Sequence, residues 1–138
     1  MLQRRLRRLT HKAHGSSQMT TEEGKVDWRS VCPISSALDV LGDKWSLLIV
    51  RDLIIHGPRT YSQFLESQES ISTNILASRL ELLTCLKLIE RTTPEAASRN
   101  NAYRLTDAGA ALRPVLEALG KWAGKHLSDF HANIVKMK

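Results

Sequence analysis

The segment that decides the fold is ISTNILASRLELLTCLKLIERTTPEAASRNNAYRLT, residues 71–106. It opens with Ser72, a residue type that often caps the N-terminus of a helix. Leu76, Leu80 and Leu83 follow at positions i, i+4 and i+7, so they share one face of a helix. We therefore predict an amphipathic helix that begins after Ser72 and buries its leucines.

The opposite face of this predicted helix carries small or polar side chains, namely Asn74, Ala77, Ser78 and Glu81. A helix that enters the DNA major groove needs such a face, because long apolar groups near its N-terminus would block access to the base edges. This face is therefore predicted to be free to contact a partner.

Two short β-strands are predicted after this helix, at residues 88–93 and 102–106. The polar segment between them, residues 94–101, is rich in turn-forming residue types. Arg99, near its tip, suits a contact with a phosphate or with the minor groove. The hairpin is therefore predicted to be a wing.

Three further helices are predicted upstream. The first covers residues 31–41 and ends at Gly42. The second covers residues 44–56 after the capping residue Asp43, and its apolar circumference places it at the centre of the core. A short third helix begins at residue 59 or 60.

A last helix is predicted after Thr106, with a break or bend near Pro114. It carries a long apolar stripe, which includes Leu112, Val115, Leu116, Leu119, Trp122 and Ala123. One small domain has little left to cover this stripe, so a partner subunit on Leu116, Leu119, Trp122 and Ala123 is the economical interpretation.

The predicted order of helix, turn, helix, strand, turn, strand and helix over residues 45–109 is that of a winged helix-turn-helix. This is a mostly α fold with a small β wing (α+β). Its usual work is reading duplex DNA.

The net charge of +6 over 138 residues is less informative than it looks. Five of the 20 Lys and Arg residues lie in residues 1–18, where there is no acidic residue, so 15 bases face 14 acids in the rest. A strongly basic body would by itself have indicated nucleic-acid binding. Any DNA-binding face must therefore depend on where individual charges lie.

We expect residues 1–30 to form a disordered or tag-like segment and linker, residues 31–130 the domain, and residues 131–138 a tail. Residues 1–18 have three interpretations, which the sequence leaves open. They are extra sequence before a native start at Met19, an arm that touches the DNA backbone, or an Arg-rich transit peptide.

Enzyme, metal and membrane functions find no support in the sequence. It contains no Ser-His-Asp, paired-carboxylate or phosphate-loop pattern, so we expect no enzyme and no cofactor. The five histidines are scattered, so no metal site is expected. Without a membrane-spanning run or a secretory signal, and with only two distant cysteines, the expected compartment is the cytoplasm.

Several short motifs in this order resemble those of the HxlR-type regulators, relatives of the MarR-type winged helices. They are Cys32-Pro33, Leu38-Asp39-x-Leu41-Gly42-x-Lys44-Trp45, Ile71-Ser72, Ser78-Arg79-Leu80, Leu88-Ile89-Glu90-Arg91, Tyr103-x-Leu105-Thr106-x-x-Gly109 and Leu112-x-Pro114-x-Leu116-x-x-Leu119-x-x-Trp122. Each motif is weak alone, but together they cover about residues 31–125.

The resemblance implies a homodimer that binds inverted-repeat operators in promoter DNA. It also implies that the first and last helices form the dimer interface. It implies that the helix after Ile71-Ser72 enters the major groove and that the wing lies along the backbone. Carried over by position, the DNA-facing residues are Ser72, Thr73, Asn74, Ser78 and Arg79, with Arg99 in the wing. The chain departs from the family at Thr60, Glu66, Glu69 and Glu81, where a base is common, and at Lys87, where a glycine is usual.

Three basic residues have two interpretations each. Lys44 contacts a phosphate or is a solvated residue at a helix start, and Arg91 follows the same logic. Arg79 binds phosphate, which is the favoured interpretation, or pairs internally with an acid such as Glu66 or Glu81.

Cys32 is the candidate redox-sensing residue. At the N-terminus of the first predicted helix, the helix dipole would favour its thiolate form. The resemblance implies sensing of oxidants or of electrophiles such as quinones and aldehydes, although an inert position at a dimer interface remains the alternative. Cys85 is interpreted as a small core residue.

The leading hypothesis is therefore a dimeric transcriptional regulator that responds to a small electrophile or another effector. The rival hypothesis is a winged-helix module that binds a protein and no specific DNA. The near-neutral body and the acids in the helix-turn-helix favour the rival, and the salt dependence of binding would separate the two.

Overall fold

The computed structural model describes residues 27–96 and 101–137. Most of its elements are helices, and three short strands form one antiparallel sheet in the order β1-β3-β2. The predicted fold class, mostly α with a small β wing, is therefore confirmed. The elements are α2 (Pro33–Leu41), α3 (Ser46–His56), β1 (Arg59–Thr60), α4 (Tyr61–Leu65), α5 (Thr73–Cys85), β2 (Ile89–Arg91), β3 (Ala102–Leu105), α6 (Asp107–Ala110) and α7 (Arg113–His126). The predictions for residues 1–18 and for Arg99 lie outside the described residues.

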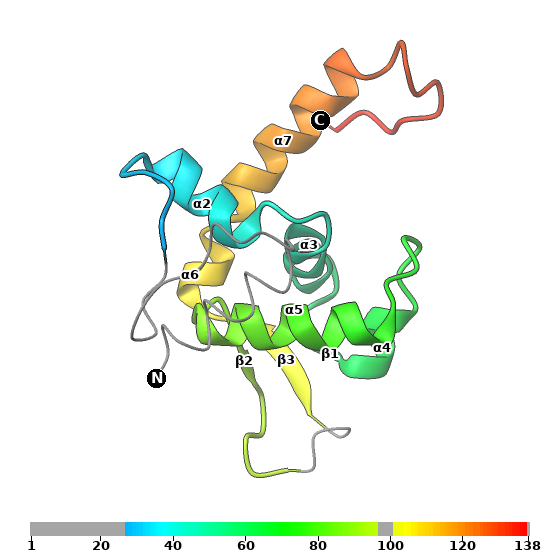
Figure 1. Ribbon diagram of the computed structural model, residues 1–138. Coiled ribbons are helices and arrows are strands. Elements are labelled where there is room, and N and C mark those ends of the chain that lie inside the picture. Colours follow the sequence, from blue (N-terminus) through cyan, green and yellow to red (C-terminus); the bar gives the residue numbers. More distant parts are fainter. Residues whose placement is uncertain (1–26, 97–100, 138) are drawn as a thin grey trace.

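Helix α5 forms as its sequence predicts. The Ser72 hydroxyl accepts a hydrogen bond from the Ile75 N–H (3.3 Å), so it satisfies one of the free donors of the first turn. Leu76, Leu80 and Leu83 are buried in the main core. Figure 1 shows α5 between the wing hairpin on one side and α2 and α7 on the other.

The core is built around α3. Ile49 and Leu53 of α3 pack with Phe64 of α4, Leu76 of α5 and Tyr103 of β3. Because α3 supplies the centre, the helix-turn-helix and the sheet share one apolar cluster rather than packing separately.

Asp43 starts α3, but the helix begins at Ser46, two residues later than predicted. Its Oδ2 accepts hydrogen bonds from the N–H groups of Trp45 and Ser46, both at 3.0 Å, and its Oδ1 accepts from the Ser46 hydroxyl at 2.6 Å. The side chain thus replaces the first turn of backbone hydrogen bonds.

Helix α2 begins at Pro33 and has Gly42 as its C-cap, close to the predicted range. The segment before it is fixed by Arg29, which forms an ion pair with the buried carboxylate of Asp39. A buried carboxylate needs such a partner. The described part of the expected linker is therefore anchored to α2 from Arg29 onward.

Strand β1 was not predicted from the sequence. Arg59 and Thr60 pair with Tyr103 and Ala102 of β3, in a segment predicted as the start of a helix. Two residues are too few to show the alternation by which a strand is recognised. Thr60 also caps α4, because its hydroxyl accepts from the Gln63 N–H while the Gln63 side chain accepts from the Thr60 N–H.

The end of α5 is a tight turn at Lys87, whose backbone has φ 61°. This is the left-handed conformation expected where a glycine is usual in related proteins. The Lys87 carbonyl accepts from the Thr106 hydroxyl (2.6 Å), and the Leu88 N–H donates to the Leu83 carbonyl (3.0 Å). These two bonds hold the strained residue in place.

The predicted last helix is two helices, as the expected break near Pro114 indicates. Thr106 caps α6, and α7 begins at Arg113 with Pro114 in its first turn, where a missing N–H is harmless. Gly109 of α6 lies against β2, and a Cβ there would be 2.0 Å from the Leu88 carbonyl oxygen. Within the described residues, no helix has the length and hydropathy needed to cross a membrane.

Candidate nucleic-acid interface

The N-terminal end of α5 presents the polar surface that the sequence predicts. Ser72, Thr73, Asn74 and Ala77 are exposed, and Ser78 is half-buried. The Ser72 hydroxyl is already engaged as the helix cap, and the Thr73 carbonyl accepts from the Tyr61 hydroxyl (2.8 Å). The first turn of α5 is thus fixed to α4 while the Thr73 and Asn74 side chains remain accessible.

Arg79 does not lie where the favoured interpretation put it. Arg79 is 4% exposed, and its Nη1 lies 3.7 Å from Oδ1 of Asp43. The favoured interpretation as a phosphate contact is therefore wrong for this conformation, because a buried guanidinium offers no donor to a phosphate. Internal pairing is correct in kind, but the acid is Asp43 rather than Glu66 or Glu81.

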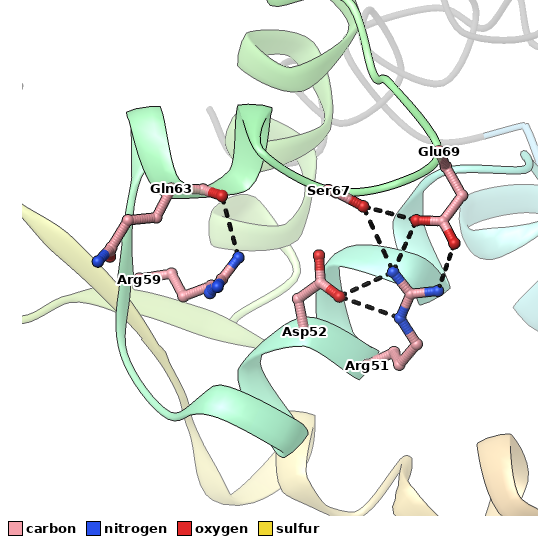
Figure 2. Close-up of polar contacts among 6 residues, drawn as sticks. All are labelled: Arg51, Asp52, Arg59, Gln63, Ser67 and Glu69. Carbon is pink, nitrogen blue, oxygen red and sulfur yellow. Dashed lines mark hydrogen bonds and ion pairs between the residues drawn. The ribbon is translucent and has the colours of Figure 1, made fainter.

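The turn between α4 and α5 is held by an ion-pair cluster that sequence reasoning missed (Figure 2). Arg51 of α3 donates from Nη1 and Nη2 to the two carboxylate oxygens of Glu69, each at 2.8 Å. The same guanidinium donates from Nε and Nη2 to Oδ1 of Asp52 at 3.0 and 2.8 Å. The Ser67 hydroxyl donates to Glu69 Oε1 at 2.5 Å.

This cluster fixes the charge states of its members. The hydrogen bonds from Arg51, partly opposed by burial, lower the pKa of Glu69 to about 2. The pKa of Arg51 is raised, mainly by its hydrogen bonds to Glu69. Glu69 therefore anchors the turn between α4 and α5 to α3.

A second arginine supports α4 in the same region (Figure 2). Arg59 Nη1 donates to the Gln63 carbonyl at 2.9 Å, near the C-terminal end of α4, where carbonyls lack helical partners. The first helix of the helix-turn-helix is therefore fixed at its N-terminus by the Thr60–Gln63 capping box and at its C-terminus by Arg59.

The base of the wing is closed by Asn101, which is fully buried. Its Oδ1 accepts from the Thr93 N–H (2.9 Å) and its Nδ2 donates to the Ala96 carbonyl (3.1 Å). Sequence reasoning took Asn101 only as a turn former, because nothing in its neighbours marks it as buried. Asn101 therefore holds the two sides of the hairpin together through these two hydrogen bonds.

Two of the expected phosphate contacts are exposed cations. Arg91 lies over the Tyr103 ring (6.0 Å to the centroid) at a groove of about 650 Å³ between α5 and the sheet, which Ala77 and Thr84 also line. Lys44 is exposed at the α2–α3 connection, with its Nζ 5.3 Å from the Trp45 ring centre. Both can donate to an anion from outside.

α2 and α7 lie on the side of the molecule away from the wing (Figure 1), and the exposed apolar side chains on and next to these two helices make up the apolar face. Ile34 of α2 is 73% exposed, and Leu119 and Trp122 of α7 are 51% and 54% exposed. Leu116 and Ala123 are half-buried beside them. Further members of the face are Val31, Leu38 and Val115.

The two cysteines differ in environment. Cys32 is exposed at the N-cap of α2, next to the apolar face, and its N–H donates to the Ser30 hydroxyl (3.2 Å). Cys85 is buried with Val40 and Leu82, as a small core residue would be. Within residues 27–96 and 101–137, no three His, Cys, Asp or Glu side chains gather as metal ligands do.

These features define a winged helix-turn-helix fold: a capped helix with an exposed polar N-terminal face, a wing beside it, and an apolar face on the far side. The chain belongs to the HxlR-like helix-turn-helix family, whose model matches residues 40–130. It is therefore a transcriptional regulator of the helix-turn-helix type.

Named relatives agree with this assignment. The chain is 38% identical over 92 residues to the uncharacterized HTH-type transcriptional regulator sll1512 of Synechocystis sp., which covers 66% of this chain and 67% of that protein. It is 32% identical over 95 residues to the HTH-type transcriptional regulator YodB of Bacillus subtilis, covering 68% and 84%.

Solved structures give the same fold. The reduced form of YodB matches with a TM-score of 0.60 and 31% identity, covering 72% of this chain and 98% of that one. The redox regulator HypR in its oxidized form matches with a TM-score of 0.59 and 26% identity, covering 67% and 94%.

Proposed function

We propose that this regulator acts as a cytoplasmic homodimer that binds inverted-repeat operators in promoter DNA. The observation that carries the proposal is the exposed, small and polar N-terminal face of α5 beside the wing. Thr73, Asn74 and Ser78 would meet base edges, and Ser72 would lie at the edge of the groove. Small side chains allow the helix backbone to approach the bases closely.

Contacts with the DNA backbone would fix the register of each subunit. Among the expected phosphate contacts, Arg91 and Lys44 are exposed. Arg99 of the wing is a further candidate. Phosphate contacts carry no sequence information themselves, but they orient the helix that does. Among the acids of the helix-turn-helix, Glu69 would not repel the DNA backbone strongly, because its charge is balanced by Arg51.

The second subunit would cover the apolar face of α2 and α7. Soluble monomers rarely expose apolar patches of this kind. A twofold dimer through this face would repeat α5 in both subunits, and the proposal requires the two α5 helices to lie about one DNA turn apart. Leu116, Leu119, Trp122 and Ala123 are the proposed interface residues of α7.

The proposal is tested by fluorescence anisotropy of the full chain with duplex DNA from upstream of its own gene. We expect binding that falls steeply between two salt concentrations, because phosphate contacts release counterions. A shuffled duplex of the same composition should bind more weakly. Binding that is insensitive to salt and sequence would favour a protein-interaction module instead.

We further propose that Cys32 is the site at which an electrophile acts. Its exposed position at the N-cap of α2, next to the proposed interface, favours this role. The Cys32 Sγ would form a bond to a ring carbon of a quinone while the C=C π bond of that carbon breaks. The carbonyl oxygens would carry the proton released by the thiol and the one displaced from the ring carbon, so that the product is a hydroquinone thioether. The bulky adduct would then disturb the spacing of the two subunits.

A quinone should release DNA from the wild type and leave Cys32→Ser bound. Cys85→Ser is the matched control, because Cys85 is buried and its loss should not protect binding. Release of DNA from Cys32→Ser at the same rate as from the wild type would remove Cys32 as the sensor and leave the DNA-binding proposal intact.

A further inference from the structure

Arg79 lies on the recognition helix α5 but is directed into the protein. Its Nη2 donates to the Ser78 hydroxyl at 3.1 Å, while Nε and Nη1 have no hydrogen-bond partner among the described residues. Burial lowers the pKa of Arg79, and the negative charge of Asp43 partly offsets this effect. A cation is thus held in the interior with an incomplete set of partners.

The partner carboxylate has a second task. Asp43 lies directly after Gly42, the C-cap of α2, and its two oxygens accept the three hydrogen bonds that start α3. The same carboxylate lies 3.7 Å from the guanidinium of Arg79. One side chain therefore connects the end of α2, the beginning of α3 and the middle of α5.

Stability alone does not account for this arrangement. A buried ion pair gains little when its geometry is imperfect, and replacing it with apolar groups of similar volume is often neutral or stabilising. The pair is longer than a hydrogen bond, and two guanidinium nitrogens lack acceptors. Its effect must be sought in the orientation of the helices that it joins.

We propose that Arg79 is a positioning residue for DNA recognition, which orients α5 against the α2–α3 connection through Asp43. Because Asp43 follows α2, the contact also relays a displacement of α2 at the apolar face to the recognition helix. This inference rests on the proposed DNA-binding function. It assigns Arg79 no contact with DNA.

The decisive measurement is the salt dependence of DNA binding by Arg79→Met. Loss of a phosphate contact reduces the slope of log K against log salt by about one, whereas loss of a positioning contact leaves the slope unchanged. We expect an unchanged slope and an affinity that falls by about 2- to 30-fold, the usual range for such coupling. Leu82→Met, also buried on α5, is the matched control and should change neither quantity.

A double-mutant cycle tests the role of Asp43. Asp43→Asn removes the charge but keeps one acceptor oxygen, which can take the place of Oδ2 and accept from the Trp45 and Ser46 N–H groups that start α3. If the two residues act as one unit, the affinity of the double variant Asp43→Asn/Arg79→Met should equal that of Arg79→Met alone. Arg79→Lys should not restore affinity, because an ammonium lacks the planar fork of the guanidinium. Urea unfolding of each variant shows whether it is folded.

The possible failures are distinct. A wild type that binds no duplex in a salt-dependent manner overturns the proposed function and this inference together. A wild type that binds, with a slope lowered by about one in Arg79→Met and restored in Arg79→Lys, overturns the positioning role alone. Additive losses in the double variant would remove Asp43 from the account.

Discussion

Individual residues in unusual environments hold the two ends of α5, the proposed recognition helix. Lys87 ends α5 with φ 61°, a conformation that costs a residue with a Cβ about 1 kcal/mol relative to glycine. Glu69 and Arg51 fix the turn before the same helix. The two ends of α5 are therefore fixed by contacts and backbone conformations of individual residues, and not by the leucines that bury the helix in the core.

Replacement of Lys87 by glycine should stabilise the protein by about 0.5–1 kcal/mol, because glycine adopts the left-handed conformation without strain. Urea unfolding measures the change. Lys87→Ala is the matched control: it removes the same charged group but keeps a Cβ, so it should leave the free energy of unfolding nearly unchanged. Equal stabilisation by both variants would show that charge, not backbone strain, is responsible.

Glu69→Gln should make stability less dependent on pH in the acid range. The pKa of Glu69 is lowered to about 2, so its ion pair stabilises the fold fully above the unfolded pKa near 4.5 and is lost as pH falls towards 2. We expect the variant to be less stable than the wild type by about 1 kcal/mol at pH 7, a value reduced for solvent screening, with the difference vanishing near pH 2.

Denaturant unfolding at several pH values between 2 and 7 measures this difference. Glu66→Gln, an exposed acid in the same turn, is the control and should run parallel to the wild type. A Glu69→Gln difference that persists unchanged at pH 2 would show that the carboxylate charge contributes nothing.

Local chemistry could be predicted where it follows from a residue and its close neighbours in sequence. Ser72 as a helix cap and Leu76 as a core residue were predicted correctly. The direction of Arg79 was not, because its partner Asp43 comes from a distant segment. Whether a charged residue on a helix pairs inward or faces solvent depends on tertiary contacts that the periodicity does not show.

Among the elements, the wing hairpin is closed by the hydrogen bonds of the buried Asn101 side chain. β2 and β3 are short, and Asn101 supplies two hydrogen bonds across their connection. The helices and the order of the strands were predicted, whereas β1 was missed and the hairpin strands were predicted too long. Two- and three-residue strands are set by pairing partners, not by their own pattern.

Asn101→Ala should loosen the wing and destabilise the protein by about 1–3 kcal/mol, because the Thr93 N–H and the Ala96 carbonyl lose their partner. Hydrogen exchange of the Thr93 amide should accelerate strongly. Exchange in α3, at the centre of the core, should accelerate only as far as the loss of global stability requires. Unchanged protection of Thr93 would mean that this bond does not close the wing.

In the whole molecule, the proposed DNA-binding surface and the proposed dimer interface lie on different sides. The wing and α5 lie on one side, and the apolar face of α2 and α7 lies on the other (Figure 1). Hydrophobic patterning predicted the α7 part of this face, because its stripe exceeds what one small domain can cover. Its continuation over α2 could not be derived from residue patterns, since it depends on how the two helices pack.

Trp122→Glu should convert a dimer to a monomer, because it places a charge at the centre of the apolar face. Sedimentation velocity measures the mass in solution. Lys121→Glu, at a neighbouring exposed position of α7, is the control for the added negative charge and should remain dimeric. A wild type that sediments as a monomer at micromolar concentration would contradict the proposed interface.

The central claim is that two copies of α5 read an inverted repeat in duplex DNA. In vitro selection from a pool of random duplexes with the full chain tests it without knowledge of the operator. We expect the enriched sequences to contain two inverted half-sites whose centres are about one helical turn, roughly 10 base pairs, apart. Selection that enriches no common sequence, or only a single half-site, would contradict the account.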